Sequence, residues 1–172
     1  MRETFLRMRY ESPLGRYVLV SSERGVICAA PEHRAAARLA RWEKEGIEIR
    51  DGDGHNREAA AQLDEYFAGT LRQFSVLLDL RGTAFQREVW ELLREIPYGE
   101  TCSYSQIARA LGRPGASRAV GRAAGTNPVA IIVPCHRVIG AGGELVGYGG
   151  GLERKRALLE LEASVLRRMP NT

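Results

Sequence analysis

One cysteine in the second half of the chain has neighbours that could make it a nucleophile. An apolar, β-branched run from Val129 to Val133 ends at Pro134, and Cys135, His136 and Arg137 follow directly. A buried strand that ends at a proline presents the next side chain at a fixed position, and cationic neighbours favour the reactive thiolate. The alternative is a buried structural cysteine, which would have little use for a histidine and an arginine beside it. The pattern therefore favours nucleophilic catalysis by Cys135.

A carboxylate on the last predicted helix is the second candidate for chemistry. Glu162 lies at the centre of the helix's apolar face, and a buried carboxylate is costly unless it is paired. Because Cys135 and His136 are sequence neighbours, we expect a bridging water to complete a chain from Cys135 through water and His136 to Glu162. A structural salt bridge from Glu162 to an arginine is the alternative. The helix is expected from Leu152 to about Met169, with Leu158, Leu159, Val165, Leu166 and Met169 on the apolar face.

Two short helices and a tight turn are predicted upstream of the cysteine. Ser103 and Gln106 form a capping-box pattern, Leu111-Gly112-Arg113 turns the chain, and Pro114 is expected at the first position of the next helix. That second helix is built from Gly, Ala and Ser and carries only Arg118 and Arg122 as long side chains. Small residues let a backbone approach a narrow minor groove closely, although tight packing between helices would also favour them.

The charge of the chain is distributed unevenly. Residues 1–80 carry 12 basic and 13 acidic side chains, and residues 81–172 carry 13 basic and 8 acidic ones, so the net charges of −1 and +5 give +4 overall. Five arginines and a single acidic residue, Glu100, lie between Tyr98 and Gly140. This concentration around the proposed nucleophile favours a nucleic acid as the partner over a merely solvated surface.

The first part of the chain is predicted to be a separate α+β unit. We place the boundary at Arg81-Gly82, which gives an N-terminal scaffold domain (1–80) and a mostly helical C-terminal domain (81–172). A capping-box pattern at Thr83 and Gln86 opens the first helix of the second domain. The elements expected in the first domain are short strands within 4–29, helices at 32–45 and 57–67, a polar loop at 46–56 and an extended segment at 74–80.

Several motifs together resemble the O6-alkylguanine-DNA alkyltransferases, also called methylated-DNA–protein-cysteine methyltransferases. The likeness runs from about Phe85 to Glu162, and the first 80 residues resemble the family's N-terminal domain more loosely, through Ser12-Pro-Leu-Gly15. It implies a small antiparallel, RNase H-like sheet with helices, followed by a winged-helix-like domain with a helix-turn-helix. The motifs are Pro-Cys-His-Arg-Val at 134–138, Asn127-Pro128, Tyr104, the small-residue helix with Arg118, and the loop 147–152.

The resemblance implies DNA repair by direct reversal of damage. Cys135 would take a methyl or larger alkyl group from O6-alkylguanine, and from O4-alkylthymine, irreversibly and once per molecule, without a metal or an organic cofactor. His136 would accept the thiol proton through water while Glu162 orients the imidazole. Tyr104 would donate to the leaving guanine, and Asn127 would brace the turn before the active-site segment.

The resemblance also implies how the damaged base is reached. The nucleotide would be flipped out through the minor groove, and Arg118 would fill the vacated stack. Tyr104, Ser105 and Arg113 are the other expected DNA contacts. Gly149 stands where many members carry serine, which alters the expected tolerance for bulky alkyl groups. The flipped guanine would meet main-chain groups of Cys135, Val138, Tyr148 and Gly149.

Composition sets further expectations. The three cysteines at wide spacings and the charged N-terminus predict a cytoplasmic protein without disulfides, and no apolar run is long enough for a membrane span. The zinc site of some relatives does not carry over, because Cys28, His33 and His55 lack a ligand spacing. We expect double-stranded DNA with alkylated bases as the partner of a monomer, with clustering on DNA left open.

Three other functions compete with this interpretation. A Cys–His hydrolase would use a thiolate but has no need of a helix-turn-helix, and its histidine is normally distant in sequence. A plain DNA-binding regulator would explain the basic helices but not Cys135 or Glu162. A non-catalytic protein that binds alkylated DNA would lack the acceptor cysteine that this chain has.

Overall fold

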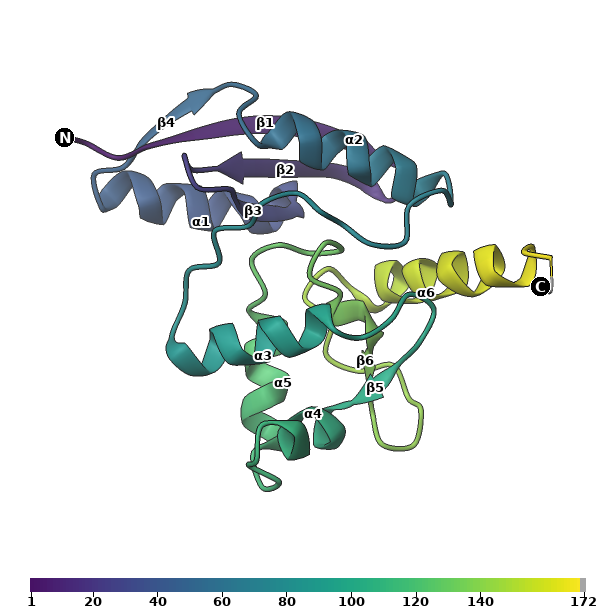
Figure 1. The fold of residues 1–172 in the computed structure, drawn as a ribbon. Coiled ribbons are helices and arrows are strands. Elements are labelled where there is room, and N and C mark those ends of the chain that lie inside the picture. The colour runs from purple at the N-terminus through teal and green to yellow at the C-terminus, as the bar shows by residue number, and fades with distance from the viewer. Residues whose placement is uncertain (171–172) are drawn as a thin grey trace. The chain divides into compact units, whose positions relative to one another are not determined.

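The computed structural model describes residues 1–170, and the chain divides into two compact units (Figure 1). Unit 1 comprises Met1–Arg81 together with Pro128–Ala130, and unit 2 comprises Gly82–Asn127 together with the chain from Ile131 onward. Both units combine helices with strands, so the predicted α+β fold class is confirmed. None of the helices within residues 1–170 is long and apolar enough to cross a membrane.

Unit 1 is built on a four-stranded sheet with the order β3-β2-β1-β4. The predicted antiparallel sheet is correct for three strands, whereas β4 runs parallel to β1. The predicted polar loop at 46–56 was wrong in part, because it contains β4. This strand is short and polar and lies at the sheet edge, where Arg7 binds Asp51, so it lacks the apolar alternation of a central strand. The strands are β1 (Thr4–Ser12), β2 (Gly15–Ser21), β3 (Val26–Pro31) and β4 (Glu48–Asp51).

Helices cover both faces of this sheet. Strand β2 is buried over its last five residues, and successive side chains of a strand point to opposite faces. Its Val18 and Val20 belong to the apolar cluster that α1 (Glu32–Lys44) closes with Trp42. Helix α2 (Asn56–Phe67) packs against β1 and β2, and the Tyr10 hydroxyl donates to Asp64 of that helix at 2.7 Å.

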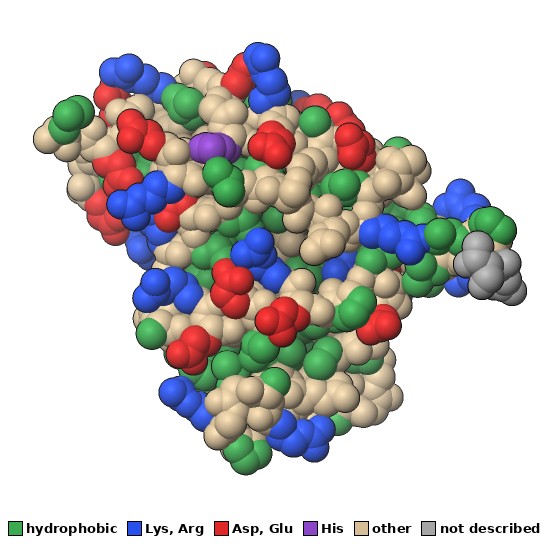
Figure 2. All heavy atoms as spheres, viewed as in Figure 1, with side chains coloured by type: hydrophobic (Ala, Val, Ile, Leu, Met, Phe, Trp, Pro, Cys, Tyr) green, Lys and Arg blue, Asp and Glu red, His purple; other side chains and the backbone are tan. Residues whose placement is uncertain are grey.

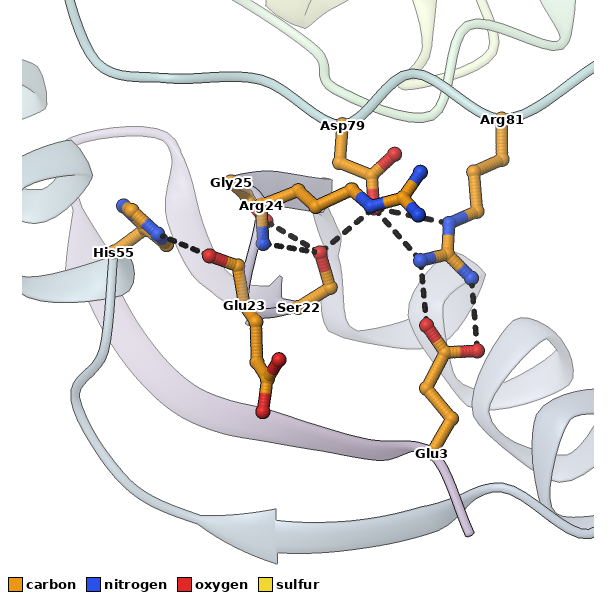
Figure 3. A network of polar contacts seen from close by, with 8 residues as sticks. All are labelled: Glu3, Ser22, Glu23, Arg24, Gly25, His55, Asp79 and Arg81. Carbon is orange, nitrogen blue, oxygen red and sulfur yellow. Dashed lines mark hydrogen bonds and ion pairs between the residues drawn. The ribbon is translucent and has the colours of Figure 1, made fainter. Parts of the chain in front are cut away.

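A polar network fixes the last residues of unit 1 (Figure 3). Arg81 donates to both carboxylate oxygens of Glu3, at 2.6 and 3.1 Å, and to Asp79 at 2.7 Å. Asp79 also accepts from Ser22 at 2.7 Å, in the turn between β2 and β3. The last residues of unit 1 are therefore bound to the residue that precedes β1 and to the residue that follows β2. Pro128 and Ala130 complete the unit through backbone hydrogen bonds with Ala29 of β3.

Unit 2 opens with three helices, and both predicted capping boxes are present. Thr83 caps α3 (Ala84–Arg94) with Gln86, and Ser103 caps α4 (Tyr104–Ala110) with Gln106. Gly112, at φ +71°, ends α4 in a left-handed turn, in which the N–H of Gly112 donates to Arg109 and that of Arg113 to Ala108. The prediction that Pro114 begins the next helix was wrong, because α5 spans Ser117–Gly125 and Pro114 lies in the preceding turn.

The rest of unit 2 surrounds Cys135. A 3₁₀ turn, η1 (Cys135–Arg137), leads into β6 (Val138–Ile139), which pairs in parallel with β5 (Cys102–Ser103). Helix α6 (Leu152–Arg167) buries Leu158, Glu162 and Val165. Leu166 and Met169 were expected on this buried face but are 37% and 46% exposed, and Met169 lies beyond the end of the helix.

Candidate active site

Cys135 is presented by a turn rather than by the end of a continuous strand. The predicted strand at 129–133 is interrupted at Ile131, which has φ +71° and is buried. A left-handed conformation is rare for a β-branched residue, so this backbone is strained, and the strain is held by the surrounding packing. Cys135 follows as the half-buried first residue of η1, with its N–H donating to the carbonyl of Val133 at 2.8 Å.

The Asn127 amide joins this turn to the thiol. Its Nδ2 donates to the carbonyl of Val133 at 2.8 Å and to Cys135 Sγ at 3.1 Å. One side chain therefore satisfies a backbone carbonyl of the turn and supplies a hydrogen bond to the sulfur. A donor directed at sulfur stabilises a thiolate more than a thiol, because the charged form is the better acceptor.

His136 and Glu162 form a completely buried pair. His136 Nε2 lies 2.5 Å from Glu162 Oε2. Burial lowers the pKa of His136 and outweighs the opposing effect of Glu162, so the imidazole is neutral near pH 7. An ionised carboxylate can only accept hydrogen bonds, so Nε2 carries the proton and Nδ1 keeps its lone pair. Within residues 1–170, Nδ1 is buried without a hydrogen-bond partner, which leaves it available as a proton acceptor.

Glu162 is the centre of a larger polar cluster. Burial would raise the pKa of Glu162, but hydrogen bonds and charge from His136 and Arg137 outweigh it and lower the pKa to about 2. Arg137 donates to the carboxylate from Nε at 2.8 Å and to the carbonyl of Ile96 from Nη1 at 2.8 Å. The water-bridged chain and the structural salt bridge were weighed as alternatives, but the carboxylate binds the histidine and the arginine at once.

This geometry changes the expected electrostatics of the thiol. His136 and Arg137 were interpreted as cations beside Cys135. The guanidinium of Arg137 instead neutralises Glu162, and the buried imidazole of His136 is neutral. The sequence neighbours therefore place little net positive charge at the sulfur.

Gly99 is a site residue that sequence reasoning missed. Its N–H donates to Glu162 Oε1 at 2.9 Å, and its φ of +77° favours glycine. A Cβ at this position would lie 2.1 Å from the side chain of Leu166, so no larger residue fits without rearrangement. The sequence signal was the Pro97-Tyr98-Gly99 turn, which indicated the end of a helix but not its contact with a carboxylate 63 residues later.

Tyr104 and Lys155 meet at one carbonyl oxygen. The Tyr104 hydroxyl donates to the carbonyl of Val146 at 3.0 Å, and Lys155 Nζ donates to the same carbonyl at 2.9 Å and to that of Val138 at 2.5 Å. Burial, and then the negative charge of Cys135, raise the pKa of Tyr104, so its hydroxyl keeps its proton near pH 7. Tyr104 therefore lies within the electrostatic reach of Cys135.

Lys155 was also missed, although its position carried a signal. It precedes Leu158 by three residues and Glu162 by seven, which places it on the buried face of α6. A lysine there is unusual, and its side chain is 0% exposed.

The residues expected to contact a flipped base lie in η1, in β6 and in the loop before α6. Val138 is buried in β6, and Tyr148 is half-buried in the loop before α6. Gly149 is exposed in the same loop. The structure thus brings Val138 into contact with Lys155 and brings Tyr104 to the same carbonyl oxygen as Lys155, whereas it places Gly149 at the surface.

The expected DNA contacts of α4 and α5 lie on exposed or partly exposed positions. Arg113 and Arg118 are exposed, and the Arg113 guanidinium lies over the Phe85 ring at 5.5 Å. Ser105 is half-buried, and its hydroxyl lies 3.0 Å from that of Ser103. At the end of unit 2 that carries α4, basic side chains appear on the face drawn in Figure 2.

The glycines in α5 and just before it are not required by packing within residues 1–170. A Cβ at Gly115 or Gly125 would meet no atom within 4 Å, and one at Gly121 would make only ordinary contact with the Tyr104 ring at 3.8 Å. The helix packs against the protein through Val120, Ala123 and Ala124, which are buried. Of the two explanations for these glycines, close approach to an external surface therefore fits better than tight helix packing.

Metal ligands are not grouped in the part of the chain that the structure describes. Within residues 1–170, no three His, Cys, Asp or Glu side chains are placed to hold a metal ion together. His55, one of the residues considered for zinc, instead lies 3.1 Å from the carbonyl of Glu23 (Figure 3).

Known proteins with similar sequences match most of this chain. A methylated-DNA–protein-cysteine methyltransferase of Mycobacterium tuberculosis is 68% identical over 106 residues, which are 62% of this chain and 64% of that protein. The matched stretch thus spans less than two thirds of this relative. The protein of the same name from Methanosarcina acetivorans is 48% identical over 159 residues, 90% of this chain and 96% of its own.

Solved structures and family descriptions agree with these relatives. The structure of Mycobacterium tuberculosis OGT in complex with DNA has a TM-score of 0.79 and 47% identity, and the alignment covers 94% of each chain. Residues 6–80 match the ribonuclease-like domain of 6-O-methylguanine DNA methyltransferase, and residues 84–164 match its DNA binding domain. The predicted RNase H-like first domain and DNA-binding second domain are therefore confirmed. The chain belongs to the 6-O-methylguanine DNA methyltransferase family.

Proposed function

We propose that this protein repairs DNA by transferring an alkyl group from O6-alkylguanine, and from O4-alkylthymine, to Cys135. The observation that carries the proposal is the relation between the thiol and the His136–Glu162 pair. Sγ accepts from Asn127, and the adjacent imidazole is neutral, oriented by a carboxylate and left with a buried proton acceptor. Each molecule acts once, because the thioether that forms is a stable product.

The residues of unit 2 can carry out this transfer in one displacement. The thiol proton passes through a water to Nδ1 of His136, while Glu162 holds the imidazole and stabilises the positive charge that develops on it. The sulfur then attacks the alkyl carbon, an S–C bond forms, and the C–O bond breaks with its electron pair left on guanine. Asn127 keeps the sulfur in line by its hydrogen bond.

Tyr104 is the donor for the departing base. The guanine leaves with negative charge, and a hydroxyl that keeps its proton near pH 7 can donate to it. In the free protein the hydroxyl donates to the carbonyl of Val146, so it is already ordered at the site. Main-chain groups of Val138, Tyr148 and Gly149 are proposed to hold the purine.

Reaching the base requires double-stranded DNA to be opened. The lesion lies inside the base stack, so the nucleotide must be flipped out, which costs a few kcal/mol. The exposed Arg118 is proposed to occupy the vacated stack, and the glycines of the helix that carries it are not needed for internal packing. Arg113 and Ser105 are proposed to contact phosphates. The relative crystallised as OGT in complex with DNA supports this assignment of the partner.

The competing functions have less support. A Cys–His hydrolase would leave α4 and α5 without a role, and a plain DNA-binding regulator would leave the buried His136–Glu162 pair without one. A cytoplasmic location and a monomeric state are proposed with the repair function, and the three cysteines, which form no disulfide within residues 1–170, agree with a reducing compartment.

The direct test of the site is a single-turnover assay with DNA that contains one O6-methylguanine. The parent protein is expected to remove the methyl group with one event per chain, and Cys135→Ser is expected to remove none. His136→Asn and Tyr104→Phe should transfer the group more slowly, by about 10²-fold or more. Transfer by Cys135→Ser at the parent rate would rule out the proposed acceptor.

Base flipping has a test of its own. Arg118→Ala is expected to slow repair of duplex DNA by at least about tenfold while leaving transfer from the free base O6-methylguanine unchanged, since only the duplex has a stack to fill. Arg2→Ala, which removes the same charge from unit 1, is the control. Equal losses on both substrates would contradict the role of Arg118.

A further inference from the structure

Lys155 is a buried ammonium group without an acidic partner. It is one of two lysines in the chain, and its side chain is 0% exposed. Its Nζ donates to the carbonyls of Val138 and Val146, and within residues 1–170 it forms no ion pair with a carboxylate. Carbonyl dipoles compensate a buried charge only in part, so the site should require a negative charge nearby.

The other charges buried in unit 2 cancel. Glu162 is ionised and pairs with the guanidinium of Arg137, while His136 is neutral. Lys155 is therefore the one uncompensated positive charge among the buried ionisable side chains of unit 2, within the residues described.

Cys135 is the group that can supply the missing negative charge. Lys155 Nζ binds the carbonyl of Val138, and the N–H of Val138 closes the 3₁₀ turn that begins at Cys135 by donating to the Cys135 carbonyl. Burial lowers the pKa of Lys155, and a negative charge on Cys135 acts in the opposite direction. Asn127, which donates to the sulfur, is neutral, and Tyr104 keeps its proton near pH 7, so neither side chain supplies a positive charge there.

We propose that Lys155 is the counter-ion of the Cys135 thiolate, a positioning residue that favours loss of the thiol proton. Its role in alkyl transfer rests on the proposed function, whereas its effect on the thiol does not. When the S–C bond forms, the negative charge leaves the sulfur with the guanine, and the Tyr104 hydroxyl donates a hydrogen bond to it there. Lys155 then loses its counter-ion while its two carbonyl partners remain.

The first test measures the reactivity of the thiol without DNA. The full-length parent, Lys155→Met and Lys155→Arg are treated with iodoacetamide over a range of pH, and labelling of the Cys135 peptide is followed by mass spectrometry. The midpoint of the pH profile is expected to rise by about one unit or more in Lys155→Met, and to stay near the parent value in Lys155→Arg. Lys44→Met removes the chain's other lysine, which is exposed, and should leave the profile unchanged. An unchanged midpoint in folded Lys155→Met would overturn the proposal.

A second test needs no substitution of Lys155. Protein labelled with ¹³C-lysine gives two side-chain signals, one from Lys44 and one from Lys155. In Cys135→Ser, which cannot form a thiolate, the titration midpoint of Lys155 is expected to fall by about one pH unit relative to the parent, because coupling between two ionisable groups is reciprocal. Lys44 serves as the internal reference. Identical Lys155 titrations in the two proteins would refute the ion pair even if Lys155→Met does not fold.

The two proposals fail separately. If the parent transfers no alkyl group but Lys155 and Cys135 are coupled, the proposed function is wrong and the ion pair stands. If transfer occurs and the coupling is absent, the proposed function stands and the ion pair is wrong. If both stand, transfer from damaged DNA by Lys155→Met should be slower by about tenfold at pH 7 and should recover at alkaline pH, which a purely structural defect would not do.

Discussion

The chemistry at Cys135 depends on the ionisation states of two neighbouring residues, His136 and Glu162. His136 remains a neutral base because it is buried, and Glu162 remains ionised because an imidazole and a guanidinium both donate to it. The sequence could predict the cysteine, the histidine and the carboxylate, because each breaks an apolar pattern. It could not predict that Arg137 neutralises Glu162, or that Lys155 binds the carbonyl of Val138, because both contacts join segments far apart in the chain.

At this scale Glu162 gives a prediction about stability and pH. Its folded-state pKa of about 2 lies below its ordinary value of 4.5, so its contribution is complete above pH 4.5 and is lost as the pH falls toward 2. Glu162→Gln is expected to lower the free energy of unfolding at pH 7 by about 3 kcal/mol, a difference that narrows in acid. Urea unfolding over this pH range tests it, with the exposed Glu153→Gln as the control. A difference in unfolding free energy between the parent and Glu162→Gln that does not change with pH would contradict an ionised Glu162.

The helices α4 and α5 determine how closely unit 2 can approach a partner. Their capping and turn residues were readable from the sequence, because Ser103, Gln106 and Gly112 act on groups within a few residues. The start of α5 was not readable, since Pro114 suits a turn as well as the first position of a helix. Strand β4 was missed for another reason: it forms by pairing with residues of β1 that lie 44 positions earlier in the chain.

The half-buried Gly125 at the end of α5 gives a prediction at the element scale. Gly125→Ala meets no atom within 4 Å, so it should leave stability unchanged or raise it by up to about 1 kcal/mol. Its methyl group is nevertheless expected to weaken binding to duplex DNA, because it occupies the surface proposed to enter the minor groove. Melting temperature and fluorescence anisotropy would measure the two effects.

A matched substitution separates helix propensity from backbone conformation. Gly112→Ala also has free space, but its φ of +71° should cost about 1–2 kcal/mol of stability. DNA affinity in Gly125→Ala equal to that of the parent would contradict the groove assignment for α5.

Across the whole molecule, the charge excess lies in residues 81–172, with a net of +5 against −1 in residues 1–80. Composition alone could predict this asymmetry, and the sequence pattern predicted an α+β first domain followed by a mostly helical second one. It could not predict that Pro128–Ala130 belongs to unit 1, because three residues carry no compositional signal. On the face drawn in Figure 2, acidic and basic side chains are interspersed over unit 1.

This distribution predicts a salt dependence carried by unit 2. Affinity for duplex DNA should fall as salt rises, and Arg113→Ala should reduce the slope of log K against log salt concentration by about 0.9, the value for one phosphate contact. Arg2→Ala should leave the slope unchanged. Binding titrations at several salt concentrations would measure both, and equal slopes for the parent and Arg113→Ala would exclude a phosphate contact there.

The most direct test of the central claim is the intact mass of the protein after incubation with an excess of duplex DNA that contains O6-methylguanine. We predict that every chain gains the mass of one methyl group, that the gain maps to the peptide that holds Cys135, and that longer incubation adds nothing further. A protein that stays unmodified while the lesion disappears, or that carries the methyl group on another residue, would contradict the account.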